Sequence, residues 1–303
     1  MAIGYVGIGS MGGALARRLL LKEPLLVYDA NEAAVSKFVE LGATPAADLS
    51  EVAAKCEIIF LCLPTSEHVE KAIFGVEGRA GLLQSAKHGA LIVDQTTGDP
   101  TATRAMAQRL AEKGINLVDA PVSGGPQGAD AGTIAIMVGA SPTLYDRIAP
   151  VLHRISPNVF HAGGVGTGHV AKLANNLLSA GQRLASLEAI ALAVKNGIEP
   201  QKAVDIINAG SGRNFFVEKF MSSHIISGKL NSGFTVGLSH KDVRLACKLG
   251  VDSGVTMFFG NIAREFQQMT INEMGADAQV NSVALMMDRL AGTHVVPEDY
   301  SLD

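Results

Sequence analysis

Short apolar runs alternate with amphipathic segments through the first half of the chain. The apolar runs cover residues 3–8, 25–28, 58–63, 91–93, 117–118, 134–138 and 159–160, and longer segments with helical spacing, such as 31–41 and 100–113, lie between them. Nearly continuous apolar runs are typical of strands that are buried on both faces of a parallel sheet. The repeated strand–helix–strand units therefore predict a doubly wound α/β domain.

The pattern changes after about residue 163. Residues 163–168 are rich in glycine, and residues 169–195 form one long stretch of helical spacing, rich in Ala and Leu. This stretch carries few charged residues, so we expect a helix that is buried on most of its faces. The remainder also has helical character, interrupted by glycines. The sequence thus predicts two domains: a sheet-based one over residues 1–163 and an all-helical one over 164–303.

Composition excludes several classes of protein. Of the 303 residues, 48% are hydrophobic and 18% are charged, so the chain can bury large cores and is not disordered. The net charge of -4, the absence of Trp and the lack of any long basic run argue against a nucleic-acid partner.

Targeting signals and cysteine usage favour a cytoplasmic protein. The first basic residues, Arg17 and Arg18, follow the N-terminal apolar stretch, whereas a signal peptide has them before it. No run of 18 or more uncharged apolar residues occurs, so we expect no transmembrane helix and no membrane partner. Cys56, Cys62 and Cys247 are odd in number and widely spaced, which does not fit a disulfide framework.

A glycine motif directly follows the first predicted strand. A G-x-G-x-x-G motif is formed by Gly7, Ile8, Gly9, Ser10, Met11 and Gly12. The first glycine permits a tight turn, the second lets a pyrophosphate approach the backbone, and the third lets the next helix, predicted over residues 13–21, pack closely on the strand. The N–H groups and dipole of that helix then point at the phosphates.

Asp29 ends the second predicted strand, close to the spacing of about 20 residues at which a dinucleotide-binding unit carries its acidic residue. A carboxylate there accepts hydrogen bonds from the adenosine ribose and repels a 2′-phosphate. Since Ala30 and Asn31 follow it rather than a basic residue, the sequence favours NAD over NADP.

Further candidates lie where other strands end, because ligands of open α/β sheets bind at the carboxyl ends of the strands. Leu63 and Pro64 end one strand, and Pro64 either lines a nicotinamide site or only fixes the turn. Thr96 and Thr97 follow another strand, where they bind a ribose or cap the helix that begins near residue 99. Ser123, Gly124 and Gly125 follow a third, where a hydroxyl and bare backbone amides can hold a carboxylate.

The stretch from Gly168 to Asn176 is the most informative. At helical pitch Gly168, Lys172 and Asn176 are each one turn apart and share one face. Burial in an apolar helix lowers the pKa of a lysine towards a range useful for proton transfer. Lys172 is therefore the candidate general acid/base, and the alternative is a lysine that extends to solvent.

A last group of candidates lies in the predicted helical domain. Ser239 and Asp242 are spaced as a capping box, which would place Lys241 in the first turn of a helix, where a cation opposes the dipole and favours an anionic ligand. A solvated surface lysine is the alternative. Phe234 could cover a ring or only pack, and Arg213 is a second candidate carboxylate anchor.

Other catalytic arrangements are not indicated. The eight histidines and three cysteines show no metal-ligand spacing, so we expect no metal, and there is no G-x-S-x-G motif.

The ordered motifs at residues 7–12, 119–125, 168–176 and 240–242 resemble those of the β-hydroxyacid dehydrogenases, the family of 3-hydroxyisobutyrate dehydrogenase and tartronate semialdehyde reductase. The resemblance covers essentially the whole chain. It implies a Rossmann-type domain, an all-α domain with an active site in the cleft between the two, and dimers or tetramers formed through the helical domain. It further implies that Lys172 is catalytic with support from Asn176, that Ser123, Gly124 and Gly125 hold the substrate carboxylate, and that Thr97 and Lys241 contact cofactor or substrate.

Residues and resemblance together predict an NAD(P)-dependent oxidoreductase that moves a hydride between NAD(H) and a short 3-hydroxy acid or its semialdehyde. The alternatives are a succinic or tartronate semialdehyde reductase that uses NADPH, an imine reductase, and a non-catalytic dinucleotide-binding sensor. Imine reductases usually lack the catalytic lysine, and a sensor has no need of a proton shuttle, so Lys172 argues against both.

Overall fold

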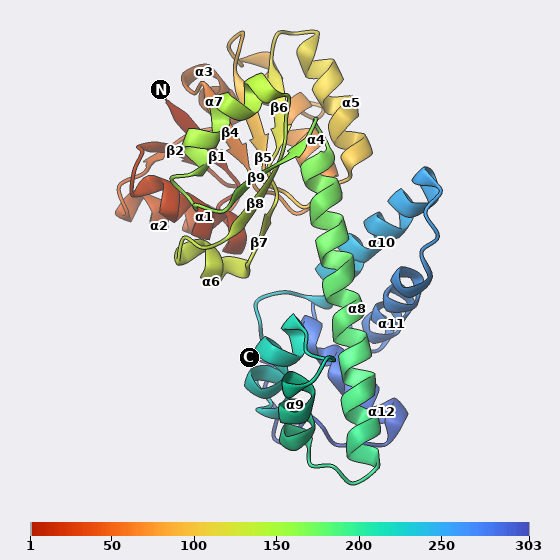
Figure 1. Ribbon diagram of the computed structural model, residues 1–303. Coiled ribbons are helices and arrows are strands. Elements are labelled where there is room, and N and C mark those ends of the chain that lie inside the picture. Colours follow the sequence, from red (N-terminus) through yellow and green to blue (C-terminus); the bar gives the residue numbers. More distant parts are fainter. Residues whose placement is uncertain (1, 303) are drawn as a thin grey trace. The chain divides into compact units, whose positions relative to one another are not determined.

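The computed structural model describes residues 2–302, which fall into two compact units that divide between Lys172 and Leu173. The first unit contains a nine-stranded sheet within the described residues, in the order β3-β2-β1-β4-β5-β6-β8-β7, with β9 paired to β8 (Figure 1). Its strands are β1 (Ile3–Val6), β2 (Leu25–Tyr28), β3 (Thr44–Pro45), β4 (Ile58–Leu61), β5 (Leu91–Asp94), β6 (Asn116–Asp119), β7 (Val122–Ser123), β8 (Ala135–Gly139) and β9 (Val159–Gly163).

Helices connect the strands and cover both faces of the sheet. They are α1 (Ser10–Leu20), α2 (Glu32–Glu40), α3 (Leu49–Lys55), α4 (Ser66–Phe74), a 3₁₀ turn (Leu82–Gln84), α5 (Pro100–Ala111), α6 (Gly125–Asp130) and α7 (Pro142–Leu152). Alternate strand residues pack on opposite sides: Tyr5 and Phe60 belong to the core under α1 and α7, whereas Val6 and Leu61 belong to the core under α3, α4 and α5. Burial on both faces explains the continuous apolar runs, and the predicted doubly wound domain is confirmed.

One edge of the sheet differs from the parallel arrangement that the apolar runs predict. Strands β1 to β6 pair in parallel, but β8 pairs antiparallel with both β6 and β7. Between β6 and β8 the chain holds only β7 and the short α6, too little for the long crossover that a parallel return requires. The sequence pattern does not reveal β3 and β7, which are two residues long each.

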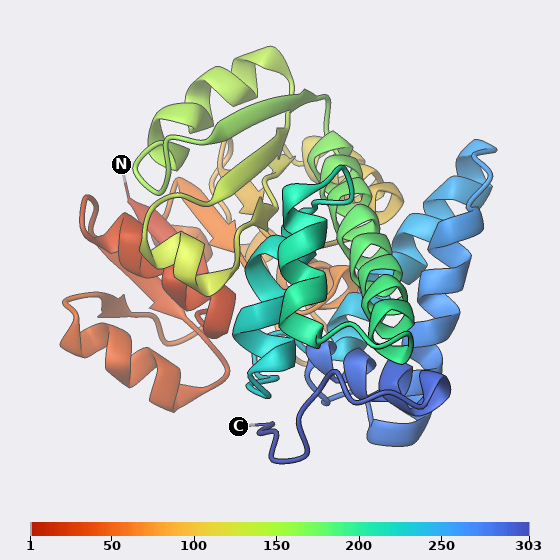
Figure 2. The same ribbon diagram turned by 60° about the horizontal axis from the view of Figure 1, so that its bottom comes forward.

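The second unit is helical. It contains most of α8 (Thr167–Lys195), then α9 (Pro200–Ala209), a π-helical segment (Val217–Ile226), α10 (Val236–Ser253), α11 (Phe258–Met274), a 3₁₀ turn (Val280–Ser282) and α12 (Val283–Ala291). Leu187 and Ile190 of α8 share a core with Val204 of α9 and Met221 of the π-helical segment, and Figure 2 shows these segments beside one another. The all-helical character predicted for this part of the chain is confirmed.

Helix α8 begins two residues earlier than predicted, because Thr167 and Gly168 of the glycine-rich stretch already belong to it. Among the helices of the described chain it is the one that is long and apolar enough to cross a membrane, in contrast to the sequence expectation. Length and composition alone are weak grounds for a span, since the core helix of a globular protein meets the same criterion.

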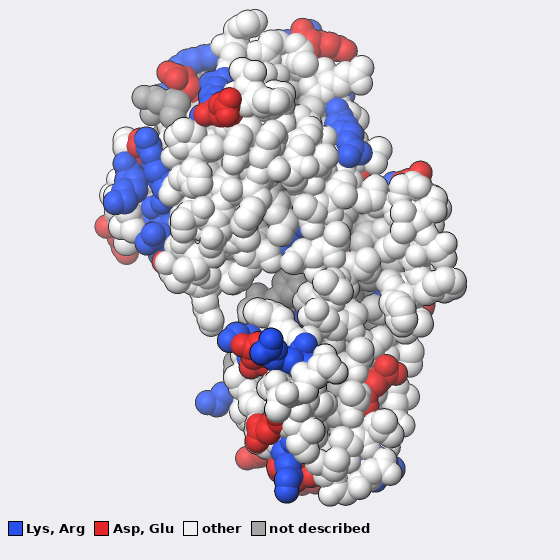
Figure 3. Space-filling view, in the orientation of Figure 1, with Lys and Arg blue, Asp and Glu red and all other residues white. Residues whose placement is uncertain are grey.

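Several large apolar side chains of the second unit are exposed around the end of α10 and the start of α11. Val251, Phe258, Phe259 and Ile262 are each more than half exposed. The space-filling view shows that the surface over these helix ends carries few charged side chains (Figure 3). We call these four residues the apolar patch.

Candidate functional site

The glycine loop between β1 and α1 has the geometry that its sequence predicts. Gly7 has a φ of 86°, and a Cβ there would lie 2.4 Å from the carbonyl oxygen of Cys62. A Cβ on Gly12 would lie 2.0 Å from the carbonyl oxygen of Gly7, so the helix packs on the loop as closely as backbone allows. Gly9, by contrast, faces open space, with no atom within 4 Å of the position that a Cβ would occupy. The loop is therefore closed on its protein side and open on the side where a pyrophosphate would bind.

Helix α1 begins at Ser10, three residues before the predicted start, with Gly9 as its N-cap residue and no side chain as a cap. Ser10 is exposed and Met11 is half-buried. The first-turn N–H groups are thus not occupied by a capping side chain, which leaves them oriented for an anion.

Asp29 lies at the end of β2 and is held against the glycine loop. Its Oδ2 accepts a hydrogen bond of 2.7 Å from the N–H of Ile8, and its Oδ1 accepts one of 2.8 Å from the N–H of Asn31. The carboxylate is therefore fixed beside the loop and has lone pairs left for ribose hydroxyls. A fixed negative charge at this point disfavours a 2′-phosphate.

A side-chain hydrogen bond links the segments that follow β4 and β5. The N–H of Leu63 donates to Oγ1 of Thr96 over 3.0 Å, which places Leu63 and Pro64 beside the strand end that leads to Thr97. The N-cap of α5 is Asp99, whose Oδ1 accepts from the N–H of Thr101, so the alternative in which Thr97 caps this helix is wrong. Thr97 is half-buried and remains a predicted cofactor contact.

Ser123 ends β7, and the two glycines after it lead into α6. Gly124 and Gly125 have φ values of 138° and 68°, which a residue with a Cβ adopts only with strain. A Cβ on Gly125 would meet nothing within 4 Å, so its backbone is accessible. This geometry suits a backbone that a carboxylate approaches closely, as the sequence predicts.

Asp119, at the end of β6, is completely buried and fixes the beginning of α8. Its Oδ1 accepts a 2.6 Å hydrogen bond from the N–H of Gly166, and its Oδ2 accepts a 2.7 Å bond from the N–H of His169. A Cβ on Gly139 or Gly168 would lie 2.4 and 2.8 Å, respectively, from a carboxylate oxygen of Asp119. The carboxylate thus fits a space bounded by two glycines and compensates the positive end of the helix.

The imidazole ring of His169 also anchors this turn of α8. Its Nε2 donates to the carbonyl oxygen of Thr96 over 2.9 Å, and its Nδ1 lies 3.0 Å from Oγ1 of Thr103. Oδ2 of the buried Asp94 is 3.9 Å from Nε2. Burial raises the pKa of the Asp94 carboxyl, and the nearby His169 opposes that rise.

Lys172 follows this anchored turn on α8. It is 8% exposed, and it lies one helical turn after Gly168, the glycine against which the Asp119 carboxylate packs. The sequence pattern points to Lys172 but gives no role to Asp119 and His169, which determine where the helix around it begins. The sequence does carry a signal that could have identified these two residues, because Asp119 lies in the motif at residues 119–125 and His169 lies in the motif at residues 168–176.

Asn176 lies one turn after Lys172, and its amide is fixed within the second unit. Its Nδ2 donates to Oδ2 of the buried Asp242 over 2.6 Å, and the Nζ of Lys241 lies 3.1 Å from Oδ1 of the same carboxylate. Asp242 therefore connects the two predicted site residues Asn176 and Lys241.

The predicted helix start at Ser239 is wrong. Helix α10 begins at Val236, and its N-cap is Thr235, which accepts from the N–H of Leu238. Ser239 is buried inside the helix and accepts from Nε2 of Gln267 over 2.9 Å. Lys241 consequently lies beyond the first turn, so the helix-dipole argument does not apply to it, and it forms an ion pair with Asp242.

Two other predicted site residues of the second unit are Arg213 and Phe234. Their backbone–backbone hydrogen bonds do not link them to Asn176, Lys241 or Asp242. Arg213 is exposed in the segment between α9 and the π-helical segment, where its N–H donates to the carbonyl oxygen of Gly210. Phe234 is half-buried before α10, and its carbonyl oxygen accepts from the N–H of Val280.

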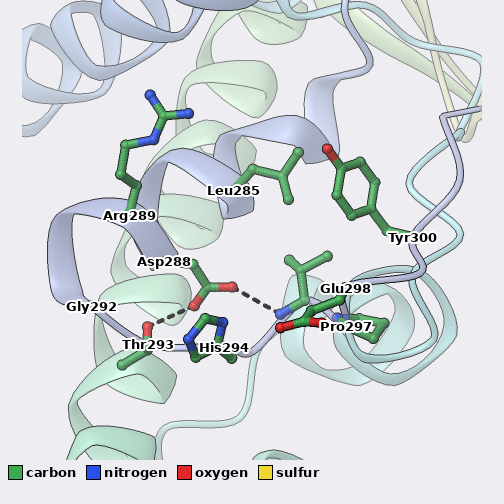
Figure 4. A pocket seen from close by; sticks show the side chains of 10 residues that line it. Leu285, Asp288, Arg289, Gly292, Thr293, His294, Pro297, Glu298 and Tyr300 are labelled. Atoms are coloured by element: carbon green, nitrogen blue, oxygen red, sulfur yellow. Dashed lines mark hydrogen bonds between the residues drawn. The ribbon is translucent and has the colours of Figure 1, made fainter.

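A pocket of about 360 Å³ lies at the end of α12 in the second unit, among side chains that include Leu285, Arg289 and Tyr300 (Figure 4). Its buried Asp288 accepts hydrogen bonds from Oγ1 of Thr293 and from the N–H of Val295. The carboxylate thereby closes the turn after the helix. None of the predicted site residues lines this pocket. Residues 2–302 contain no group of three or more side chains that could hold a metal ion.

Two protein-family models match consecutive parts of the chain. One, described as the NAD binding domain of 6-phosphogluconate dehydrogenase, matches residues 2–164. The other, described as NAD-binding of NADP-dependent 3-hydroxyisobutyrate dehydrogenase, matches residues 166–287.

Individual proteins are similar over nearly the full length. The chain is 43% identical over 258 residues to 2-(hydroxymethyl)glutarate dehydrogenase of Eubacterium barkeri, which covers 84% of each chain. It is 32% identical to NAD-dependent L-serine dehydrogenase of Pseudomonas aeruginosa, covering 96% of this chain and 99% of that one. The solved structure of Mycobacterium tuberculosis 3-hydroxyisobutyrate dehydrogenase with L-serine gives a TM-score of 0.85 at 28% identity, over 94% of this chain and 98% of that one.

Proposed function

Because the chain belongs to the β-hydroxyacid dehydrogenase family, we propose that it oxidises the hydroxyl group of a short 3-hydroxy acid, and reduces the corresponding semialdehyde, with Lys172 as the general acid/base. The family membership confirms the resemblance seen in the sequence, and the chain is an NAD(P)-dependent dehydrogenase. The observation that carries the proposal is the burial of Lys172 directly after the turn of α8 that Asp119 and His169 fix.

The first unit fits a dinucleotide. Of the three glycines of the loop, Gly9 is the one that faces open space, and the Asp29 carboxylate is fixed beside the loop, so these residues would hold the pyrophosphate and the adenosine ribose. Leu63, Pro64 and Thr97 lie at the neighbouring strand ends, and Phe234 and Lys241 of the second unit are further candidate contacts. When bound, the nicotinamide supplies the hydride chemistry. NAD is the preferred cofactor because Asp29 is negatively charged and Ala30 follows it.

In the direction of oxidation, Nζ of Lys172 accepts the proton of the substrate hydroxyl, and in reduction it returns a proton to the carbonyl oxygen. Ser123, Gly124 and Gly125 bind the substrate carboxylate through a hydroxyl and accessible backbone amides. Asn176, held by Asp242, orients the lysine or the reacting oxygen. The names of the relatives include hydroxy acids with one carboxylate and with two, so they leave open whether a second carboxylate is recognised.

The test is NADH formation at mildly alkaline pH with a panel of short hydroxy acids, comparing wild type, Lys172→Ala and the control Lys37→Ala. Lys37 is an exposed lysine on α2, so its loss leaves the site intact. Removal of a general acid/base costs about 10²- to 10⁴-fold in kcat, and we expect that loss only in Lys172→Ala. Equal turnover by Lys172→Ala and Lys37→Ala would overturn the assignment of Lys172 as the general acid/base.

Each alternative function predicts a different result when the assay is extended to other substrates and to NADPH. Turnover of semialdehydes with NADPH alone identifies a semialdehyde reductase, and turnover of imines alone identifies an imine reductase. Binding of NADH with no turnover of any of these substrates identifies a dinucleotide-binding sensor.

We also propose that the protein forms a homodimer or homotetramer through its helical unit. Support comes from the apolar patch, because large exposed apolar side chains that gather at two consecutive helix ends are typical of association sites. A cytoplasmic location is proposed because Cys56, Cys62 and Cys247 are odd in number and widely spaced, which does not suit a disulfide framework. Sedimentation of wild type and of Phe259→Lys tests the association, and an unchanged mass in the variant would contradict the role of the patch.

A further inference from the structure

The short helix α6 directly follows the segment that is proposed to bind the substrate carboxylate. Its six residues, Gly125–Asp130, include two glycines, and a helix of this length and composition is not stable by itself. It therefore needs support from a neighbouring element, and it packs mainly on α1 (Figure 1). Ala129 of α6 lies in the same buried core as Ala14 of α1. The placement of the backbone at Gly124, where α6 begins, thus depends on α1.

A bidentate ion pair joins these two helices. Nε and Nη2 of Arg17 on α1 donate to Oδ1 and Oδ2 of Asp130 over 3.0 and 2.9 Å, an arrangement that fixes the orientation of both side chains as well as their distance. Asp130 is the last residue of α6, where the helix dipole disfavours a carboxylate, so Asp130 is stabilised by Arg17 and not by its own helix. Both side chains are half-exposed, so solvent screens their attraction, and the pair determines geometry more than stability.

The Arg17 side chain also connects this pair to the glycine loop. It lies back along α1 towards the loop, since a Cβ on Gly13 would be 3.5 Å from Nη1 of Arg17. The same Cβ would be 2.9 Å from the carbonyl oxygen of Ile8, so Gly13 packs directly on the loop that is proposed to hold the pyrophosphate. Arg18 contacts the turn after α6, because a Cβ on Gly132 would be 2.5 Å from its Nη2. A continuous series of contacts therefore extends from the glycine loop through Arg17 to α6.

We propose that Arg17 and Asp130 are positioning residues, which couple cofactor binding at the glycine loop to binding of the substrate carboxylate by Ser123, Gly124 and Gly125. The inference rests on the proposed function and adds that the hydroxy acid binds more tightly once NAD(H) is bound. Phosphates at the first turn of α1 hold this helix in place, and the ion pair passes that constraint on to α6. Coupling between two binding events is reciprocal, so a bound hydroxy acid tightens the binding of NAD(H) by the same factor. Both sites and the pair lie within the first unit.

The first test is amide hydrogen exchange of residues 123–132, measured by mass spectrometry with and without NADH. For wild type we expect NADH to slow exchange in this segment by at least about fivefold, the lower end of typical coupling factors. Arg17→Met keeps the aliphatic stem without the guanidinium, and Asp130→Asn loses the charge and one acceptor oxygen. In each variant the effect of NADH on residues 123–132 should fall below about twofold, whereas its effect on the glycine loop should remain.

Kinetics give an independent measurement, with the hydroxy acid that wild type oxidises. In both variants the KM for this acid at saturating NAD should rise by about 3- to 10-fold, because the coupling is lost. The kcat and the Kd of NADH for the substrate-free protein should stay nearly unchanged, because neither residue lies at the glycine loop or at Lys172. The double variant should be no worse than either single variant, since both substitutions remove the same interaction. Additive effects of the two substitutions on KM would overturn the proposal.

A matched control separates this role from a purely structural one. Arg109 forms a similarly exposed ion pair with Glu70 that joins α5 to α4, so Arg109→Met should change neither the exchange of residues 123–132 nor the KM. An Arg17→Met variant that melts at a lower temperature but keeps the protection by NADH would overturn the proposal, as would a wild type without such protection. The exchange measurement needs no substrate. Failure of every hydroxy acid in the turnover assay therefore overturns the proposed function and not the coupling between α1 and α6.

Discussion

Replacement of Asp119 by asparagine tests the view that the beginning of α8 positions Lys172. The substitution preserves shape, which matters because Gly139 and Gly168 leave no room around the carboxylate. It removes the negative charge and one of the two acceptor oxygens that receive the N–H groups of Gly166 and His169. One of these buried N–H groups then faces an amide N–H₂ group instead of an acceptor.

The expected loss in the free energy of unfolding follows from these two hydrogen bonds. Each is short, at 2.6 and 2.7 Å, and each has a charged acceptor, for which a contribution of about 1.5–3 kcal/mol is typical. Asp119→Asn should therefore lower the free energy of unfolding by about 2 kcal/mol, and Asp119→Ala by about 3–5 kcal/mol. Since domains are stable by about 5–15 kcal/mol, the asparagine variant should remain folded.

The catalytic effect is expected to exceed what lost stability explains. A displacement of about 1 Å of a catalytic group costs on the order of 100-fold in rate, so kcat for NADH formation should fall by about 10- to 100-fold in Asp119→Asn, with the KM for NAD nearly unchanged. Urea unfolding measures the first effect and steady-state absorbance of NADH the second.

Asp48→Asn is the matched control, because Asp48 also accepts an N–H bond at a helix N-terminus, that of α3. We expect it to change stability by less than about 0.5 kcal/mol, because Asn and Asp are about equally good N-cap residues, and to leave kcat unchanged. If Asp119→Asn were destabilised but kept the kcat of wild type, the reasoning that links the anchored turn to Lys172 would be refuted.

Two further residues give separate tests. Asp29→Asn removes the fixed charge beside the glycine loop, so the preference for NAD over NADP, measured as the ratio of kcat/KM values, should fall by about tenfold or more; an unchanged ratio would contradict the role of Asp29. Burial raises the pKa of Asp94, and a carboxyl whose pKa is raised by folding destabilises the folded state where it is ionised. Asp94→Asn should therefore be more stable than wild type in urea at pH 7, and the difference should shrink as the pH falls towards about 4; a difference that grows on acidification would contradict this sign.

Contiguous segments of sequence are sufficient to predict the cofactor loop and most of the fold. The glycine motif, its flanking strand and the acidic residue after the next strand lie within one βαβ unit, so local spacing alone constrains their geometry. The buried strands can be predicted for a similar reason, since an apolar run on a sheet covered on both faces is a local pattern. The strand that begins at Leu25 and ends at Tyr28 has the bounds that this pattern predicts.

Local signals fail where two of them compete or where the element is too short. Thr235 and Ser239 both have the side chain of an N-cap residue, and only packing decides between them: Ser239 is buried against Gln267, whereas Thr235 lies where the chain enters the helix. The two-residue strands β3 and β7 have no periodicity to detect, and the antiparallel direction of β8 depends on the length of the connection before it.

The sequence by itself determined the nucleotide loop, the order of the longer strands and helices, and the identity of Lys172 as the candidate acid/base. Only the tertiary structure decided what surrounds that helix. Asp119 and His169 are 50 positions apart, and a hydrogen bond between them exists only because β6 ends where α8 begins. Likewise, Arg183 is one of several charges on an apolar helix until folding buries it without a counter-charge. Spacing along the chain encodes local geometry, whereas burial and long-range pairing arise from the packed structure.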